Sequence, residues 1–405
     1  MKKALLSPSL LRNEVIPQLH DIASDMVAVA ELHSLSGDLW EIMFVMWIAE
    51  DENTIGHLSE FGSEPTGSIA SLAARELWDL HRTVWATRKL IDKEDIYENL
   101  RVMKNYVPSG SSRGGIDEET VHALSETAGA LCMARTSEEM YRSIVGFYAA
   151  NGSGLFALYK AFRWSRQRTL EPLAGLDSKG LKDLVGYESQ KAELLINTDM
   201  FIRGKEANNV LLFGDSGTGK SSSVRALLNE PGFVRQGLRM IELHKDQLAD
   251  LPEILDIIRF RNYRFIIFMD DLSFEEFEVE YKHLKALIEG GLEPKPANTL
   301  IYATSNRRNI IREVWSDRKS ASDDVHGGDT MREKLSLADR FGLSIWYGSV
   351  SKDEYMDIVR SIAARSGVSM DDGEMERLAL RWEIERGGFT GRTARQFVNH
   401  LLLQG

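Results

Sequence analysis

The stretch LLFGDSGTGKSSSV, residues 211–224, decides the fold class that this sequence predicts. An apolar segment of strand character runs into Gly214, and the pattern glycine, four residues, glycine, lysine, serine leads into a helical segment. Glycines let the backbone approach a ligand more closely than a Cβ atom would permit, and N–H groups at a helix N-terminus favour an anion. The stretch therefore predicts a phosphate-binding loop between a strand and a helix.

The side chains of this loop have expected roles in holding a nucleoside triphosphate. Lys220 would place its charge between the β- and γ-phosphates, and the Ser221 hydroxyl would coordinate Mg²⁺. The predicted nucleotide-binding residues of the loop are Gly214, Asp215, Ser216, Gly217, Thr218, Gly219, Lys220, Ser221 and Ser222. An incidental glycine-rich turn is the alternative, and the strand and helix patterns on either side disfavour it.

A second apolar segment, FIIFMDD at residues 265–271, ends in two acidic residues. At the carboxyl end of a strand, Asp270 would hold the Mg²⁺ hydration shell, and Asp271 would orient or deprotonate an attacking water. A plain solvated turn is the alternative for such a pair. With the phosphate loop upstream, we predict a metal role for Asp270, a catalytic role for Asp271, and ATP and Mg²⁺ as cofactors.

Five short apolar segments alternate with helical segments in the second half of the chain. They are residues 209–214, 239–243, 264–270, 299–305 and 343–347. This alternation is typical of an α/β fold with a parallel sheet and crossover helices. The predicted fold class is thus an α/β P-loop NTPase sheet, with helices before it and after it.

The flanking regions have helical periodicity. Apolar residues recur every three or four positions through residues 1–168, with 158–168 interpreted as a helix end and 169–180 as a linker. After the last predicted strand, SKDE at 351–354 is typical of a capping box that starts a helix. The predicted domains are an all-α N-terminal domain (1–175), an α/β nucleotide-binding domain (176–347) and a helical lid (348–405).

With these motifs, residues 181–405 resemble the AAA+ ATPases. The segment LKDLVGYESQK, residues 181–191, is similar to the one that packs its backbone around adenine in that family. The resemblance implies that Leu184, Val185 and Gly186 contact the base.

Three further residues gain roles from the same resemblance. ATSN at the end of the fourth strand implies that Asn306 bonds the γ-phosphate or the attacking water, with a simple turn residue as the alternative. LSLADRFGLSI implies that Arg340 reaches a neighbouring subunit's site in a homo-oligomer, with a surface salt bridge as the alternative. GFTGRTARQFV implies that Arg392 of the lid contacts the γ-phosphate, and Arg395 is a weaker candidate.

More narrowly, FIIFMDDLSFE together with EKLSLADRFGL resembles a bacterial family of predicted AAA+ ATPases whose function is not established. Two departures from the wider superfamily stand out. Asp271 replaces the usual glutamate, which favours slow turnover. Residues 244–264 lack the aromatic-apolar-glycine loop of protein-threading members, and the polar loop 315–334 fits either a mobile contact loop or a disordered insert.

Composition limits the partners and the location. The net charge of −12 disfavours general nucleic-acid binding, although the basic stretch 158–168 leaves such contact open. The longest apolar run, Ile42–Ala49, is too short to span a bilayer, and the N-terminus does not resemble a secretory signal. One cysteine, Cys132, expected to be a small buried residue in a helix, fits a reducing cytoplasm.

We therefore predict Mg²⁺-dependent binding and hydrolysis of ATP, with the nucleotide state controlling an unidentified protein partner through the N-terminal helical domain. One alternative is a nucleotide-gated switch or scaffold with little hydrolysis. Another is a loader or remodeller of nucleic-acid machinery.

Overall fold

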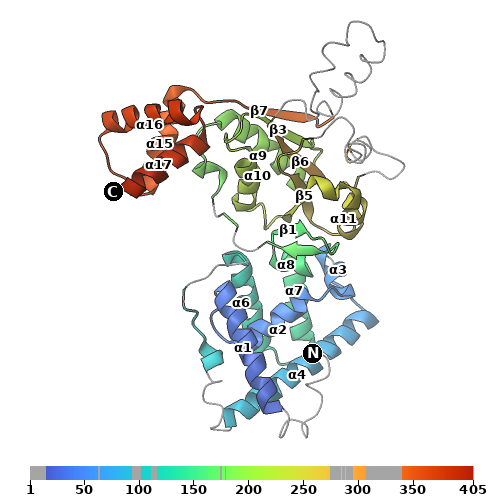
Figure 1. Ribbon diagram of the computed structural model, residues 1–405. Coiled ribbons are helices and arrows are strands. Elements are labelled where there is room, and N and C mark those ends of the chain that lie inside the picture. Colours follow the sequence, from blue (N-terminus) through green and yellow to red (C-terminus); the bar gives the residue numbers. More distant parts are fainter. Residues whose placement is uncertain are drawn as a thin grey trace, which may run out of the picture. The chain divides into compact units, whose positions relative to one another are not determined.

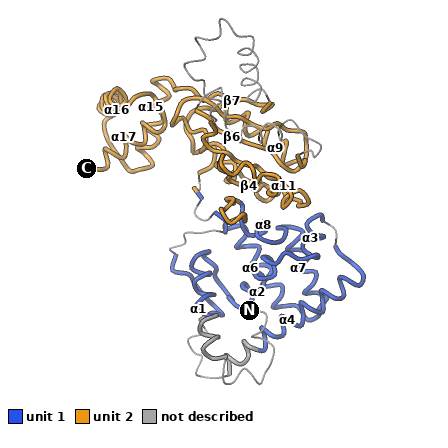
Figure 2. The backbone as a smooth tube through the Cα atoms, turned by 45° about the vertical axis from the view of Figure 1, so that its right-hand side comes forward, with its two compact units in different colours: residues 1–160, 172–176 blue, residues 161–171, 177–405 orange. Residues whose placement is uncertain are grey.

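A computed structural model of the chain (Figure 1) describes residues 15–62, 64–93, 102–110, 116–173, 176–177, 179–273, 284, 288, 295–306 and 340–404. The chain forms two compact units. The first comprises residues 1–160 and 172–176, and the second comprises residues 161–171 and 177–405 (Figure 2).

Helices build the described part of the first unit. They are α1 (Val15–His33), α2 (Leu39–Glu50), α3 (Thr54–Glu60), α4 (Ser68–Lys93), the 3-10 helix η3 (Val102–Asn105), α6 (Glu118–Met133), α7 (Ser137–Asn151) and α8 (Leu155–Leu158). The sequence of α2 is apolar on all sides, and nine of its twelve residues are buried, so it forms the centre of this unit's core. Side chains of Asn53, Asp117 and Thr136 accept N–H bonds and fix the starts of α3, α6 and α7.

Seven strands form the sheet of the second unit. Their order is β2 (Leu170–Pro172), β1 (Ala161–Trp164), β4 (Leu238–Glu242), β5 (Arg264–Met269), β6 (Thr299–Ser305), β3 (Val210–Gly214) and β7 (Leu343–Tyr347). All pairs from β1 to β7 in this order are parallel. The five predicted strands are confirmed as β3 to β7, and with the helices between them they confirm the predicted α/β fold class with a parallel sheet.

The prediction for residues 158–168 was wrong. The expected helix end contains instead the strand β1, which pairs with β4. Phe162 and Trp164 are buried while Arg163 between them is exposed, which is the alternation of a strand. Four residues are too few to separate this pattern from a helix in the sequence. The expected linker also contains β2. Since both rings are buried, they are not available to stack on nucleic-acid bases.

Helices precede, cross and follow this sheet. Those around the strands are η4 (Leu181–Asp183), α9 (Glu188–Ile202), α10 (Lys220–Ala226), η5 (Leu227–Asn229), η6 (Lys245–Asp250) and α11 (Leu251–Ile258). The segment predicted to be the lid, and called the lid below, contains α15 (Lys352–Arg365), α16 (Asp372–Arg386) and α17 (Gly391–Gln404), drawn at the red end of the chain in Figure 1. Val185 and Tyr187 pack against the lid's apolar core, so the segment before α9 contacts the lid.

The structure also bears on predictions about the capping box and Cys132. The capping box of Ser351 and Glu354 is confirmed at the start of α15. Cys132 corrects an expectation, because it lies on the exposed side of α6 rather than in the core. The N-terminal residues 1–14 and the loop 315–334 lie outside the described residues. Within the described ranges, every helix is too short or too polar to cross a lipid bilayer.

Candidate functional site

The carboxyl ends of β3, β5 and β6 meet at one edge of the sheet. Phe213 pairs with Ser305, and Met269 pairs with Ala303, so the segments that follow these three strands start side by side. In an open parallel sheet this edge is where ligands bind. The register therefore brings together the phosphate loop, the acidic pair and Asn306, which are far apart in the sequence.

The phosphate loop requires its glycines. Gly214 has φ 137°, and a Cβ atom there would lie 2.0 Å from the carbonyl oxygen of Tyr347. Gly217 has φ 82°, and its added Cβ would lie 2.7 Å from the Cβ of Arg392. Both backbone conformations are unfavourable for residues with side chains. The first glycine thus lets β7 approach the loop, and the second lets the lid approach it.

Lys220, at the start of α10, is folded back against the loop. Its Nζ donates to the carbonyl oxygens of Gly214 (2.9 Å) and Asp215 (2.6 Å) and to Oδ1 of Asn306 (3.2 Å). Burial lowers the pKa of the Lys220 ammonium from its ordinary value. The lysine charge is therefore held between the loop and the end of β6, in partly desolvated surroundings.

The carboxylate of Asp270 binds the loop and its neighbours through both oxygens. Its Oδ1 accepts bonds from the hydroxyls of Ser221 (2.5 Å) and Thr304 (2.6 Å). Its Oδ2 accepts a bond from Arg225 of α10 at 3.0 Å, and the same guanidinium nitrogen lies 2.9 Å from Glu242 at the end of β4. Ser221 and Asp270 are thus direct neighbours, as the predicted metal site requires.

Asp271 has a left-handed backbone, with φ 53°. Its N–H donates to Oγ1 of Thr304 at 2.9 Å, and its Oδ1 accepts a bond from Nδ2 of Asn306 at 2.7 Å. Because Asn306 also accepts a bond from Lys220, its amide joins the acid to the lysine. Sequence reasoning missed Thr304, which contacts both acids. The available signal was the pair of hydroxyl residues, Thr304 and Ser305, at the end of β6.

Arg392 brings the lid to the phosphate loop. Its backbone N–H donates to the carbonyl oxygen of Gly217, and its Nη1 donates to Oγ of Ser216, both at 3.1 Å. Asp215, in contrast, points toward the strand that leads into the lid. Its Oδ2 accepts bonds from the N–H and the hydroxyl of Ser349, both at 2.8 Å. The two residues therefore connect the first half of the loop to the lid and to the segment that precedes it.

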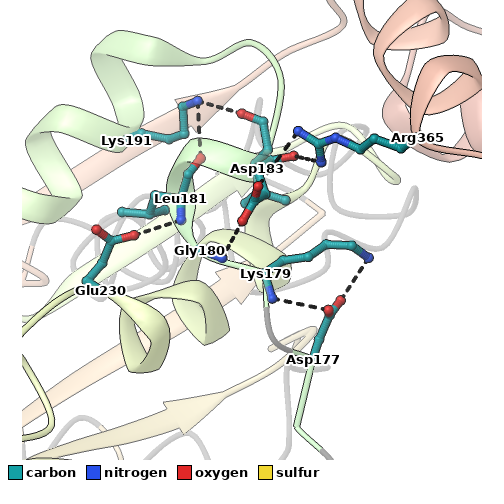
Figure 3. Close-up of polar contacts among 9 residues, drawn as sticks. Asp177, Lys179, Gly180, Leu181, Asp183, Lys191, Glu230 and Arg365 are labelled. Carbon is teal, nitrogen blue, oxygen red and sulfur yellow. Dashed lines mark hydrogen bonds and ion pairs between the residues drawn. The ribbon is translucent and has the colours of Figure 1, made fainter.

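The segment expected to contact the base is fixed by side chains from three other elements (Figure 3). The N–H of Leu181 donates to Glu230 at 2.7 Å, and the carbonyl of Leu184 accepts from Nζ of the buried Lys191 at 2.6 Å. Nη1 of Arg365, on lid helix α15, donates to the carbonyl of Asp183 at 2.8 Å. Sequence reasoning missed these three side chains, because their partners are backbone atoms that a motif does not reveal.

A cleft of about 780 Å³ contains most of the predicted residues. Leu184, Val185 and Gly186 line one part of it, and the phosphate loop from Ser216 to Ser222 lines another. Its described lining also includes Asp270, Asp271, Asn306, Arg392 and Arg395, with Gly214 and Asp215 outside the lining. Arg340 precedes β7 and is likewise outside the lining that the structure describes.

Basic residues outnumber acidic residues in the described lining of this cleft, although the chain as a whole is acidic. Seven lysine or arginine residues and three aspartates are found among its described lining residues, whereas the chain has a net charge of −12. The cations are Lys179, Lys191, Lys220, Arg225, Arg365, Arg392 and Arg395. Such a concentration of one sign in a concave surface raises the local concentration of an anionic ligand.

Comparisons with known proteins give one family and several distant structural likenesses. The family model described as "Protein of unknown function (DUF815)" matches residues 157–404. No curated protein matches the chain. Among solved structures, the Thermotoga maritima RuvB Holliday junction branch migration motor has 18% sequence identity and a TM-score of 0.39, covering 55% of this chain and 64% of its own. The FIGL-1 AAA domain in complex with ADP has 18% identity and a TM-score of 0.36, covering 56% and 73%.

The chain thus spans less than two thirds of the RuvB chain that it matches. At these identities the likeness concerns the fold alone.

Proposed function

Because the chain belongs to the DUF815 family, which is described as being of unknown function, we propose a function from the geometry of its cleft: it binds Mg²⁺-ATP and hydrolyses it. One observation carries the proposal. The glycine loop with Lys220 and Ser221, the acid Asp270 and the arginine Arg392 come from three separate parts of the sequence and surround the same cleft. This combination suits a polyphosphate better than it suits any neutral ligand.

The residues of the cleft fit ATP at both of its ends. Leu184 and Val185 with Ile358 and Ile362 of α15 supply apolar lining that suits a base. The phosphate loop, with Lys220 and Arg392, supplies donors for the phosphates at the other end. The cleft volume of about 780 Å³ lies in the ordinary range for sites that hold ligands of this size.

The same edge of the sheet fits Mg²⁺. Oγ of Ser221 and the carboxylate of Asp270 are 2.5 Å apart and are the hard oxygen ligands that this ion prefers. When bound, Mg²⁺ would neutralise charge on the phosphate oxygens. Ser221 would then release its bond to Asp270, while Thr304 and Arg225 keep that carboxylate in place.

We propose that the chain's own residues share the chemistry. Lys220 exchanges its carbonyl partners for phosphate oxygens, and Arg392 turns from Ser216 to the γ-phosphate. Asp271 orients a water for attack and receives its proton, and Asn306 holds that carboxylate in position. The 2.7 Å bond from Asn306 to Asp271 and the 3.2 Å bond to Lys220 support this division of roles.

Lys220→Ala tests the proposal. Removing a charged donor to phosphate should weaken ATP binding about tenfold to a hundredfold, measured by calorimetry with Mg²⁺ present. Lys205→Ala is the control, since Lys205 is exposed, lies after α9 and does not line the cleft. Equal ATP affinity of the Lys220→Ala variant and the parent would contradict the nucleotide site.

A nucleotide-gated switch with little hydrolysis is the second candidate. The observation in its favour is Asp271, whose carboxylate is engaged by Asn306 and whose side chain is one methylene shorter than glutamate. We further propose that Arg340 acts in the site of a neighbouring copy, and that the first unit binds a protein partner. The resemblance of the segment before β7 to the trans-acting arginine segment supports the first of these.

A further inference from the structure

Arg365 makes a polar contact from the lid to the segment expected to meet the base, and this contact has no role in the function proposed above. Its guanidinium donates to the carbonyl of Asp183 at 2.8 Å and lies 3.8 Å from the carboxylate of the same residue. The other oxygen of that carboxylate accepts the N–H of Gly180 at 3.0 Å. Figure 3 draws this bond as a dashed line. Arg365 therefore holds both the backbone and the side chain of the residue that precedes Leu184.

The other anchors of this segment come from the α/β part of the second unit. Lys191 of α9 binds the carbonyl of Leu184, and Glu230 after η5 binds the N–H of Leu181. Lys191 is buried, so its side chain has little freedom to move away from that carbonyl. Two anchors thus fix the segment to the sheet side, and Arg365 fixes it to the lid.

Arg365 also lies on the helix face that lines the cleft. Ile358, Ser361, Ile362 and Arg365 of α15 all line it, and their spacing of three, one and three residues is that of one helix face. The side chains that would cover a bound base and the arginine that holds the opposite backbone therefore move together when the lid moves.

Resting on the proposed function, we propose that Arg365 is a positioning residue for recognition of the purine base. Adenine and guanine present opposite donors and acceptors on their base-pairing edges, so a backbone held in one position favours one of them. Lys220 and Arg392 serve the phosphates, which both nucleotides share. Arg365 thus sets the preference for ATP over GTP, whereas the phosphate loop sets the affinity for both.

Arg365→Met is the direct test, because it removes the donor and keeps much of the side-chain length. Loss of one hydrogen bond that holds the segment should weaken ATP binding about threefold to tenfold. GTP binding should change less. The dissociation constant for GTP divided by that for ATP should therefore fall by a similar factor. Arg365→Lys, which keeps one donor, should restore part of the preference.

Arg360→Met is a matched control on the same helix. Arg360 is exposed, bonds Asp357 at 3.2 Å and does not line the cleft, so its loss should leave both dissociation constants unchanged. An unchanged ratio in Arg365→Met, an equal loss for both nucleotides, or a parent protein with no preference would each overturn the inference. If the parent binds ATP and Lys220→Ala does not, these outcomes leave the proposed function standing.

Discussion

At the scale of single residues, the site is a chain of contacts that couples acid, amide and lysine. Asn306 contacts Asp271 on one side and Lys220 on the other, and Thr304 contacts both aspartates. The position of the Asp271 carboxylate is therefore determined by its neighbours as well as by its own backbone. Under the proposed function this arrangement would separate nucleotide binding from turnover, since Asp271 contacts Thr304 and Asn306 and none of the groups assigned to the phosphates.

Asp271→Asn tests that separation. The amide has nearly the same shape but is a far poorer base, so ATP turnover should fall about a hundredfold or more while the ATP dissociation constant stays within about twofold. Steady-state phosphate release and calorimetry measure the two quantities. Asp256→Asn is the control, because Asp256 is an exposed residue of α11 outside the cleft. A slow parent whose turnover is unchanged by Asp271→Asn would favour the nucleotide-gated switch.

Some residues of the site could be predicted from the sequence, because their roles depend on fixed spacings within one short motif. Gly214, Lys220 and Ser221 stand at fixed intervals in one loop, so a pattern finds them. Lys191 and Arg365 act on backbone carbonyls that any residue could supply, and only the fold brings them together. No local pattern can predict such contacts.

At the scale of elements, the central strands were predictable and the short strands beyond β4 were not. All seven residues of β6 are buried, and its apolar middle, Leu300–Ala303, does not alternate with polar residues, as is typical of a strand covered on both faces. β1 has four residues and β2 has three, with partial exposure in both. So little alternation does not distinguish a strand from a helix end, and these two strands were revealed by the fold alone.

The start of α15 provides a prediction about lid stability. Ser351 accepts the N–H of Glu354 at 3.3 Å, and Glu354 accepts the N–H and hydroxyl of Ser351 at 2.8 and 2.9 Å. Ser351→Ala should therefore lower the free energy of unfolding by about 1 kcal/mol, measured by urea denaturation. Glu354→Gln, which retains the reciprocal bond, should lower it by less.

The same cap has a pH dependence of defined sign. Hydrogen bonds from the backbone and then the side chain of Ser351 lower the pKa of Glu354 from its ordinary value of 4.5. A depressed carboxyl pKa contributes stability above the unfolded value, and this contribution is lost as the pH falls through the folded value. The difference between the parent and Glu354→Gln should accordingly shrink in acid. If this stability difference were instead lost at high pH, the stabilising role assigned to the Glu354 carboxylate in the cap would be contradicted.

At the scale of the whole molecule, the question is whether one chain is enough for catalysis. Arg340 precedes β7, and the proposal assigns it to the site of a neighbouring copy. If so, Arg340→Ala should lose turnover while its own cleft still binds ATP. The ATPase rate per chain should also rise with protein concentration in the parent and stay low in the variant.

A mixing experiment decides whether Arg340 acts in trans. Arg340→Ala has an intact cleft, and Asp271→Asn has an intact arginine, so each is expected to be nearly inactive alone. An equimolar mixture should recover about a quarter of the parent rate, the fraction of head-to-tail interfaces at which both halves are intact. Parent protein mixed with each variant is the control. A mixture as inactive as its components would contradict the shared site.

The folded-back position of Lys220 has a consequence for selectivity among small anions. Its ammonium already has three oxygen partners within the protein, so an incoming anion gains only the difference between new bonds and those it displaces. A singly charged anion offers too little to compete with three internal acceptors. Under the proposed function, a polyphosphate would also engage the loop N–H groups and Arg392, and would therefore offer enough. The internal partners of Lys220 would in that case disfavour the binding of simple monovalent anions in the cleft.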